Sequence, residues 1–173
     1  IVLCANVPGL SDHDFRTSLK LLPSLSPINN TKFVPQPIAA KVRNILIIDD
    51  EEKLRTLLAR IVSLEGYTVV EAPDCKTAWK KLEQGNIDVV LCDVKLPDGN
   101  GIDLSKKMKE TYPLLEIILL TAYGNIPDGV QAIKNGAFDY ITKGDDNNKI
   151  IPLLHRAIEK VNLARRVQQL EKQ

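Results

Sequence analysis

Short, continuous apolar runs alternate with longer amphipathic segments along the chain from residue 44 onward. A continuous apolar run is typical of a parallel strand that is covered on both faces. Apolar residues that recur every three or four positions are typical of a helix packed by one face. The apolar runs predict five strands, at 44–48, 67–70, 87–92, 116–120 and 137–141.

Each predicted strand is followed by a predicted helix. Asp74 is a residue type that caps helix starts, and Gly66, Gly85 and Gly136 are residue types that end helices. The amphipathic segments predict five helices, at 52–65, 75–84, 102–110, 126–134 and from about 147 to the end of the chain. Strands that alternate with helices specify an α/β fold, here a doubly wound five-stranded parallel sheet with right-handed crossovers.

The first forty residues differ in composition from the rest. They hold five of the ten prolines of the chain, and proline favours extended or turn backbone over helix. They lack the basic start and the continuous apolar stretch of a signal peptide. We therefore expect residues 1–42 to be a flexible tail, a linker or an added expression sequence. The alternative is the end of a preceding domain.

Composition excludes several classes of protein. The net charge of +1 does not fit a basic nucleic-acid binder. No apolar run approaches the ~18 residues that a membrane-spanning helix needs. The three cysteines, Cys4, Cys75 and Cys92, do not have the spacing of a zinc site or a disulfide framework. A reduced, cytoplasmic location is the simplest expectation.

Polar residues follow four of the predicted strands. Asp49 and Asp50 follow the first strand, Asp93 the third, Thr121 the fourth and Lys143 the fifth. Strand ends of this kind converge in a doubly wound sheet, and ligands bind there. Carboxylate oxygens are the ligands that Mg²⁺ prefers. A lysine and a hydroxyl beside them suit a phosphoryl group.

The same strand ends suggest a carboxylate nucleophile. They offer no serine or histidine, so a phosphoryl group would be taken by an aspartate to form an acyl phosphate. An isolated pair of acids after a strand is more often a helix cap or a solvated turn. The joint placement of acids, hydroxyl and lysine on these strands is what points to chemistry.

Four motifs carry a resemblance to a known family. They are Ile-Asp-Asp-Glu at 48–51, Leu-Cys-Asp-Val-Lys-Leu-Pro-Asp-Gly at 91–99, Leu-Thr-Ala at 120–122 and Tyr-Ile-Thr-Lys at 140–143. Residues 43–160 resemble the receiver domain of two-component response regulators. The resemblance implies a flavodoxin-like sheet with strand order 2-1-3-4-5.

The resemblance also implies roles for the residues of the site. Asp93 would accept a phosphoryl group from a sensor histidine kinase. Asp49, Asp50, Asp93 and the backbone carbonyl of Lys95 would bind Mg²⁺.

Three further residues would respond to the phosphoryl group. Thr121 would hydrogen-bond to it, Tyr140 would turn with Thr121 as the aromatic switch residue, and Lys143 would pair with the new charge. Gly144 stands where the family usually has a proline with a cis peptide bond. We therefore expect a trans bond and a looser loop after Lys143.

Residues 121–143 are most similar to receivers of the nitrogen-regulator type, which activate transcription with an alternative sigma factor through ATPase and DNA-binding domains. The last helix continues to the end of the chain with near-heptad apolar spacing, which Arg165 interrupts. We interpret 161–173 as an extension of this helix toward an output domain. A homodimer would form through the helix at 126–134, the strand at 137–141 and the last helix.

The chain has no phosphate-binding Gly-rich motif for ATP, and we expect no direct nucleic-acid binding and no membrane association. Its only expected catalysis is its own phosphorylation and dephosphorylation, so we do not classify it as an enzyme. A phosphorylation-independent receiver-like interaction module is the alternative, because Gly144 departs from the family pattern. An aspartyl phosphatase is a remote alternative, because that class needs an acid where Lys95 stands.

Overall fold

The structure is a computed structural model that describes residues 43–122, 124–144 and 147–172. The chain divides into two units, 1–40 and 41–173, and the fold described below belongs to the second. The prediction made for residues 1–42 lies outside the described residues.

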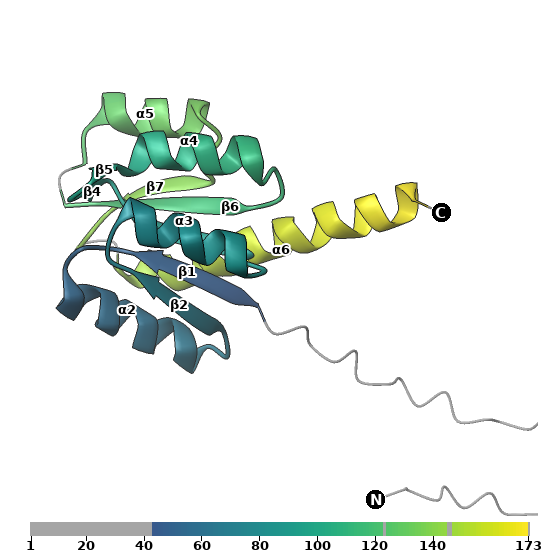
Figure 1. Cartoon of the computed structure of the whole chain (residues 1–173), viewed down its shortest axis with the longest axis horizontal. Coiled ribbons are helices and arrows are strands. Elements are labelled where there is room, and N and C mark those ends of the chain that lie inside the picture. The colour runs from purple at the N-terminus through teal and green to yellow at the C-terminus, as the bar shows by residue number, and fades with distance from the viewer. Residues whose placement is uncertain (1–42, 123, 145–146, 173) are drawn as a thin grey trace, which may run out of the picture. The chain divides into compact units, whose positions relative to one another are not determined.

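A five-stranded parallel sheet forms the centre of the second unit (Figure 1). Its strand order is β2-β1-β3-β6-β7, which is the predicted flavodoxin-like order. Each strand begins and ends within two residues of its predicted bounds. The strands are β1 (Asn44–Ile48), β2 (Thr68–Ala72), β3 (Val89–Asp93), β6 (Glu116–Thr121) and β7 (Asp139–Thr142).

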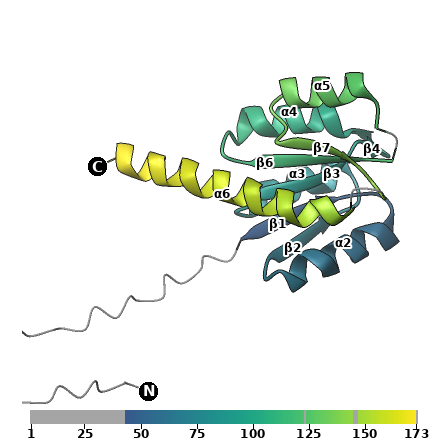
Figure 2. The same cartoon turned by 180° about the vertical axis from the view of Figure 1, so that it is seen from behind.

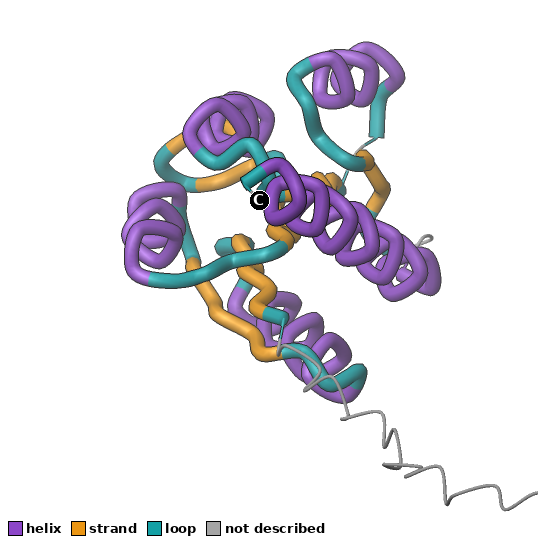
Figure 3. Tube along the Cα trace, turned by 90° about the vertical axis from the view of Figure 1, so that its right-hand side faces the viewer, coloured by secondary structure: helices purple, strands orange, loops and turns teal. Residues whose placement is uncertain are grey.

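Helices cover both faces of this sheet (Figure 3). Residues of α2 and α6 pack against one face, and residues of α3, α4 and α5 pack against the other. The helices are α2 (Glu52–Leu64), α3 (Cys75–Gln84), α4 (Gly101–Thr111), α5 (Ile126–Lys134) and α6 (Asn147–Glu171). The expected α/β class is thereby confirmed.

The apolar strands are explained by this two-sided cover. Successive side chains of a strand point to opposite faces. In β1, Ile45 and Ile47 face α2 and α6, whereas Leu46 and Ile48 face the other helices. All four are fully buried, so the strand has no polar face.

Local signals place most helix ends. Asp74 caps α3, because its Oδ1 accepts a hydrogen bond from the backbone N–H of Thr77 at 2.6 Å. Gly66 and Gly136 follow α2 and α5 with φ of +84° and +93°, a backbone region that favours glycine. One element was not predicted: a two-stranded hairpin of β4 (Lys95–Leu96) and β5 (Gly99–Asn100).

The long helix α6 extends past the end of the sheet, as Figures 1 and 2 show from opposite sides. Its buried apolar residues end at Val161, and the helix continues to Glu171. Within the described residues, no helix is long and apolar enough to cross a membrane.

Candidate functional site

Three carboxylates converge at the carboxyl ends of β1 and β3, as the sequence predicted. Asp49, Asp50 and Asp93 each offer an oxygen, and these oxygens lie within 4.8 Å of one another. Asp49 is fully buried and Asp93 is 6% exposed, whereas Asp50 faces solvent. Like charges this close repel one another unless a cation joins them.

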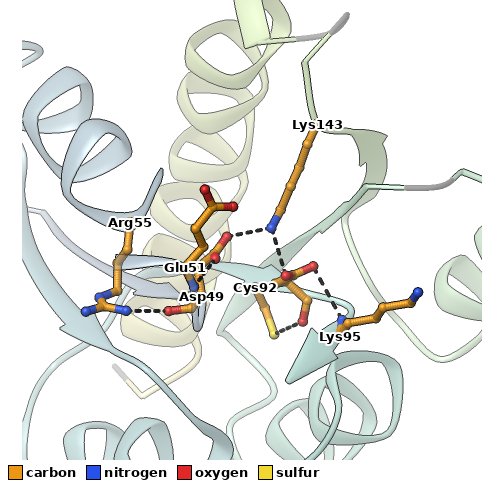
Figure 4. Close-up of polar contacts among 7 residues, drawn as sticks. Asp49, Glu51, Arg55, Cys92, Lys95 and Lys143 are labelled. Atoms are coloured by element: carbon orange, nitrogen blue, oxygen red, sulfur yellow. Dashed lines mark hydrogen bonds and ion pairs between the residues drawn. The ribbon is translucent and has the colours of Figure 1, made fainter. Parts of the chain in front are cut away.

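Lys143 lies between two of these acids (Figure 4). Its Nζ is 2.7 Å from Asp49 Oδ2 and 2.7 Å from Asp93 Oδ2. Its backbone N–H donates to the carbonyl of Thr121 at 2.7 Å, which ties the end of β7 to the end of β6. None of the described residues has a cis peptide bond, so the bond from Lys143 to Gly144 is trans, as expected.

Asp49 is held in place by neighbours on both sides of the strand end. Its Oδ1 accepts a hydrogen bond from the backbone N–H of Glu51 at 2.9 Å. Its carbonyl accepts one from Arg55 Nη1 at 2.6 Å (Figure 4). Its own N–H donates to the carbonyl of Ala72 at 3.1 Å. The Asp49 carboxylate is therefore oriented before any ligand arrives.

Burial and charge act in opposite directions on the two central groups. Burial raises the pKa of Asp93 above its ordinary value of 3.8, and the hydrogen bond and charge of Lys143 offset part of this effect. Burial by itself lowers the pKa of Lys143. Its hydrogen bonds and its attraction to Asp49 and Asp93 outweigh burial, so the pKa of Lys143 is raised. Lys143 is a firmly protonated internal cation.

A cavity of about 360 Å³ opens at these residues, with Asp50, Asp93, Lys95 and Lys143 among those that line it. A water molecule takes about 30 Å³ in the liquid, so a phosphoryl group and several waters fit. The donors are carboxylate oxygens without sulfur or imidazole, which suits a hard ion such as Mg²⁺. The residues present therefore fit the expected metal.

The main chain beyond Asp93 is closely packed. The backbone N–H of Lys95 lies 3.4 Å from Asp93 Oδ1, which places the Lys95 main chain beside this carboxylate. The Gly101 N–H donates to the Val94 carbonyl at 2.8 Å. A Cβ at Gly101 would lie 3.0 Å from Val94 Cα and would overlap the carbonyl oxygen of Asp93, so only glycine fits there.

The two predicted switch residues lie on the neighbouring strands β6 and β7. Thr121 is buried at the end of β6 and pairs in register with Thr142 of β7. Tyr140 packs partly buried against the core under α3, α4 and α5. Its hydroxyl is buried and has no hydrogen-bond partner among the described residues. A Cβ at Gly129 of α5 would lie 3.2 Å from Tyr140 Cδ1, so this glycine leaves room for the ring.

The structure brings the predicted acids, Lys95, Thr121 and Lys143 to one edge of the sheet and places Tyr140 within β7, and it adds two residues that sequence reasoning missed. Arg55 contacts the Asp49 backbone from α2, and Gly101 allows the start of α4 to touch the Asp93 backbone. Gly101, the second glycine of Asp-Gly-Asn-Gly at 98–101, is the sequence signal that could have indicated this close approach of two backbone segments. Nothing in the local sequence marked Arg55.

A parallel α/β sheet with acids, a buried threonine and a lysine at one edge is the arrangement of a signalling receiver domain. The chain belongs to the response regulator receiver domain family, which it matches over residues 45–156.

Two curated relatives illustrate the similarity. The chain is 36% identical over 124 residues to an NtrX-like response regulator of Rickettsia bellii, covering 70% of this chain and 26% of that protein. It is 35% identical over 115 residues to the DNA-binding transcriptional regulator NtrC of Proteus hauseri, covering 66% and 24%. The chain thus spans about a quarter of the length of these relatives.

Comparison with solved structures supports the same family assignment. NtrX from Brucella abortus superposes with a TM-score of 0.69 at 32% identity, over 75% of this chain and 30% of that one. The beryllofluoride-activated NtrC4 receiver domain dimer gives a TM-score of 0.65 at 30% identity, over 68% and 98%. This chain is therefore a receiver domain related to those of NtrC and NtrX.

Proposed function

We propose that the chain is a phosphorylation-dependent switch, in which Asp93 accepts a phosphoryl group from a sensor histidine kinase. The observation that carries the proposal is the placement of the nearly buried Asp93 carboxylate at an open cavity, bonded to Lys143 and beside two further acids. Acids concentrated in this way fit a site that receives a cation and then a phosphoryl group.

In the proposed step, a carboxylate oxygen of Asp93 attacks the phosphorus of a kinase phosphohistidine. The new P–O bond forms as the P–N bond breaks, and the imidazole nitrogen leaves with the electron pair. Mg²⁺, held by Asp49, Asp50, Asp93 and the Lys95 carbonyl, would supply positive charge for the phosphoryl oxygens. Lys143 already lies 2.7 Å from Asp93 and would pair with these oxygens.

The response would pass through Thr121 and Tyr140. The Thr121 hydroxyl would turn to the phosphoryl group, and Tyr140 would settle in its buried position beside Gly129. The unpartnered hydroxyl of Tyr140 makes that position costly, because a buried polar atom without a hydrogen bond costs about 1–3 kcal/mol. If two positions of the Tyr140 side chain have similar free energies, a small change at the site shifts the population from one position to the other.

The surface of α2 supports docking of a kinase. Leu57, Ile61 and Leu64 are exposed on this helix at spacings of three or four residues. The helix begins two residues after Asp50, so this apolar stripe lies on the helix that leads away from the acidic site. We infer that the kinase helix that carries the phosphohistidine packs here.

A second copy of the chain would pack on another surface. Exposed apolar residues lie on α5, which contacts β7, and on the end of α6. They are Ile126, Val130 and Ile133 on α5 and Leu163, Val167 and Leu170 on α6. One similar solved structure is itself a dimer of receiver domains. We infer a homodimer through α5, β7 and α6.

The output would be transcriptional and the location cytoplasmic, by analogy with relatives described as NtrC transcriptional regulators. The receiver domain itself would not bind DNA. We also propose that the chain has no external substrate to turn over and acts on its own phosphoryl group alone.

The test is intact-mass spectrometry after incubation with acetyl phosphate, with Mg²⁺ or with a chelator. We expect one phosphoryl adduct that requires Mg²⁺ and is absent from Asp93→Asn. Asp103→Asn, which changes an exposed acid of α4, is the matched control and should retain the adduct. If wild type forms no adduct although Mg²⁺ binds, the phosphorylation-independent interaction module is the better account.

A further inference from the structure

Two buried carboxylates lie at the opposite edge of the sheet, at the amino ends of β3 and β6. Asp88 precedes β3 and is 2% exposed, and Glu116 is the first residue of β6 and is 3% exposed. Neither takes part in the site described above. Buried carboxylates are costly unless they are paired, so their partners indicate what they do.

Asp88 holds two arginines that come from distant parts of the chain. Its Oδ1 forms an ion pair with Arg165 of α6 and lies 3.7 Å from Arg43, which precedes β1. Its Oδ2 accepts a hydrogen bond from the backbone N–H of Asn44 at 2.9 Å. One cation thus comes from α6 and one from the body of the domain.

Glu116 repeats this arrangement with lysines. Its Oε2 lies 3.0 Å from Lys160 of α6, and its Oε1 lies 3.0 Å from Lys109 of α4. Lys160 also lies 5.5 Å from the centre of the Phe138 ring, within the range of a cation–π contact. Again one cation comes from α6 and one from the body.

Apolar packing cannot hold the last turns of α6. Its buried apolar residues end at Val161, and Leu163, Val167 and Leu170 are all more than half exposed. Arg165 and Gln168 line a cavity of about 350 Å³ next to the loop that follows α4, so the helix is not tightly packed there. Lys160 pairs with Glu116 where this apolar packing ends, and Arg165 pairs with Asp88 one turn beyond it.

We propose that Asp88 and Glu116 form an ionic latch that positions the end of α6. The latch fixes the direction in which the helix leaves the sheet and the side to which Leu163, Val167 and Leu170 point. A second copy of this chain that packs on these residues would then meet them in a set orientation. The inference does not depend on phosphorylation of Asp93.

The test is hydrogen exchange of the full chain carrying Lys160→Gln and Arg165→Gln together. Each carboxylate keeps its second cation, Lys109 or Arg43, so the domain stays folded. We expect the amides of 162–171 to exchange on the order of fivefold to tenfold faster, while those of β3 and β6 are unchanged. Higher ionic strength should speed the same amides in wild type more than in the variant.

Two further variants keep the proposal falsifiable. Arg166→Gln with Lys172→Gln removes the same charge from exposed positions at the end of the chain and should leave exchange at its wild-type rate. Lys160→Arg with Arg165→Lys keeps both cations and should also exchange slowly. The latch is overturned if the latch variant and its charge-matched control exchange alike, or if the charge-keeping variant exchanges as fast as the latch variant.

Discussion

Acids lie at both edges of the sheet: Asp93 ends β3 at the carboxyl edge, and Asp88 and Glu116 lie at the amino edge, where β3 and β6 begin. The acids of the two edges differ in how many cations they contact. At the carboxyl edge, Lys143 contacts two carboxylates while Asp50 lies close beside them. At the amino edge, Asp88 and Glu116 each contact two cations. Acids gathered around one shared lysine keep excess negative charge, which suits the proposed binding of a further cation, whereas acids that each contact two cations anchor structure. The burial of a carboxylate alone does not separate these roles; the number of its cations does.

The largest expected difference between the edges concerns neutralisation of an acid. Asp88→Asn leaves Arg43 and Arg165 with buried nitrogens and no opposing charge. We expect the free energy of unfolding in urea to fall by about 3 kcal/mol. Glu110→Gln, at an exposed position of α4, is the control and should change it by less than about 0.5 kcal/mol. An equally small change for Asp88→Asn would remove the distinction between the edges.

The opposite sign is expected at the carboxyl edge. Asp50→Asn relieves repulsion among the three acids, so unfolding in the presence of a chelator should cost up to about 1 kcal/mol more than in wild type. With Mg²⁺ in excess, wild type should become the more stable protein, because a ligand stabilises the form that binds it more tightly. Urea unfolding with and without Mg²⁺ measures both. Destabilisation by Asp50→Asn without the metal would show that this edge is also an anchor.

A smaller effect tests whether Gly129 governs the position of the Tyr140 ring. Alanine in place of a helical glycine ordinarily stabilises a protein by about 1 kcal/mol. In Gly129→Ala the new Cβ meets the Tyr140 ring at 3.2 Å, so we expect less than half of that gain. The full gain should return when Tyr140 is also replaced by alanine, as a double-mutant cycle measures. Equal gains in both backgrounds would mean that Gly129 does not govern the position of Tyr140.

The smallest effect concerns an exposed acid that is bonded to backbone amides. Asp98 accepts hydrogen bonds from the N–H groups of Cys75 and Lys76, and the bond from Cys75 is the main reason that the pKa of Asp98 lies below 3.8. A lowered folded-state pKa contributes stability above the unfolded pKa, and this contribution is lost as the pH falls through the folded pKa. The stability difference between wild type and Asp98→Asn should therefore be positive at neutral pH and shrink below pH ~4. Glu83→Gln, an exposed acid on α3, should show no such trend.

Most of the fold and the positions of the site residues could be predicted from the sequence because their signals are local. Apolar runs mark the strands, capping residues mark the helices, and each site residue follows its own strand. The roles assigned to Asp93, Thr121 and Tyr140 stay predictions until they are tested.

What could not be predicted depends on contacts between distant segments. Arg165 interrupts a near-heptad apolar pattern in the sequence, yet in the structure it is one of the two cations that pair with Asp88. The β4–β5 hairpin could not be predicted either. Asp98 at its turn accepts hydrogen bonds from the start of α3, more than twenty residues earlier in the chain. No pattern along the chain pairs such residues.

Because Gly101 needs to be a glycine, the result of a mutational scan at this position requires careful interpretation. Any larger residue would have to displace the backbone oxygen of Asp93, which its Cβ would overlap. A library scored by phosphoryl uptake would therefore rank position 101 with Asp93, the proposed acceptor, although glycine has no reactive group. Intolerance to substitution at this position would reflect the close approach of α4 to the Asp93 backbone and would say nothing about chemistry at residue 101.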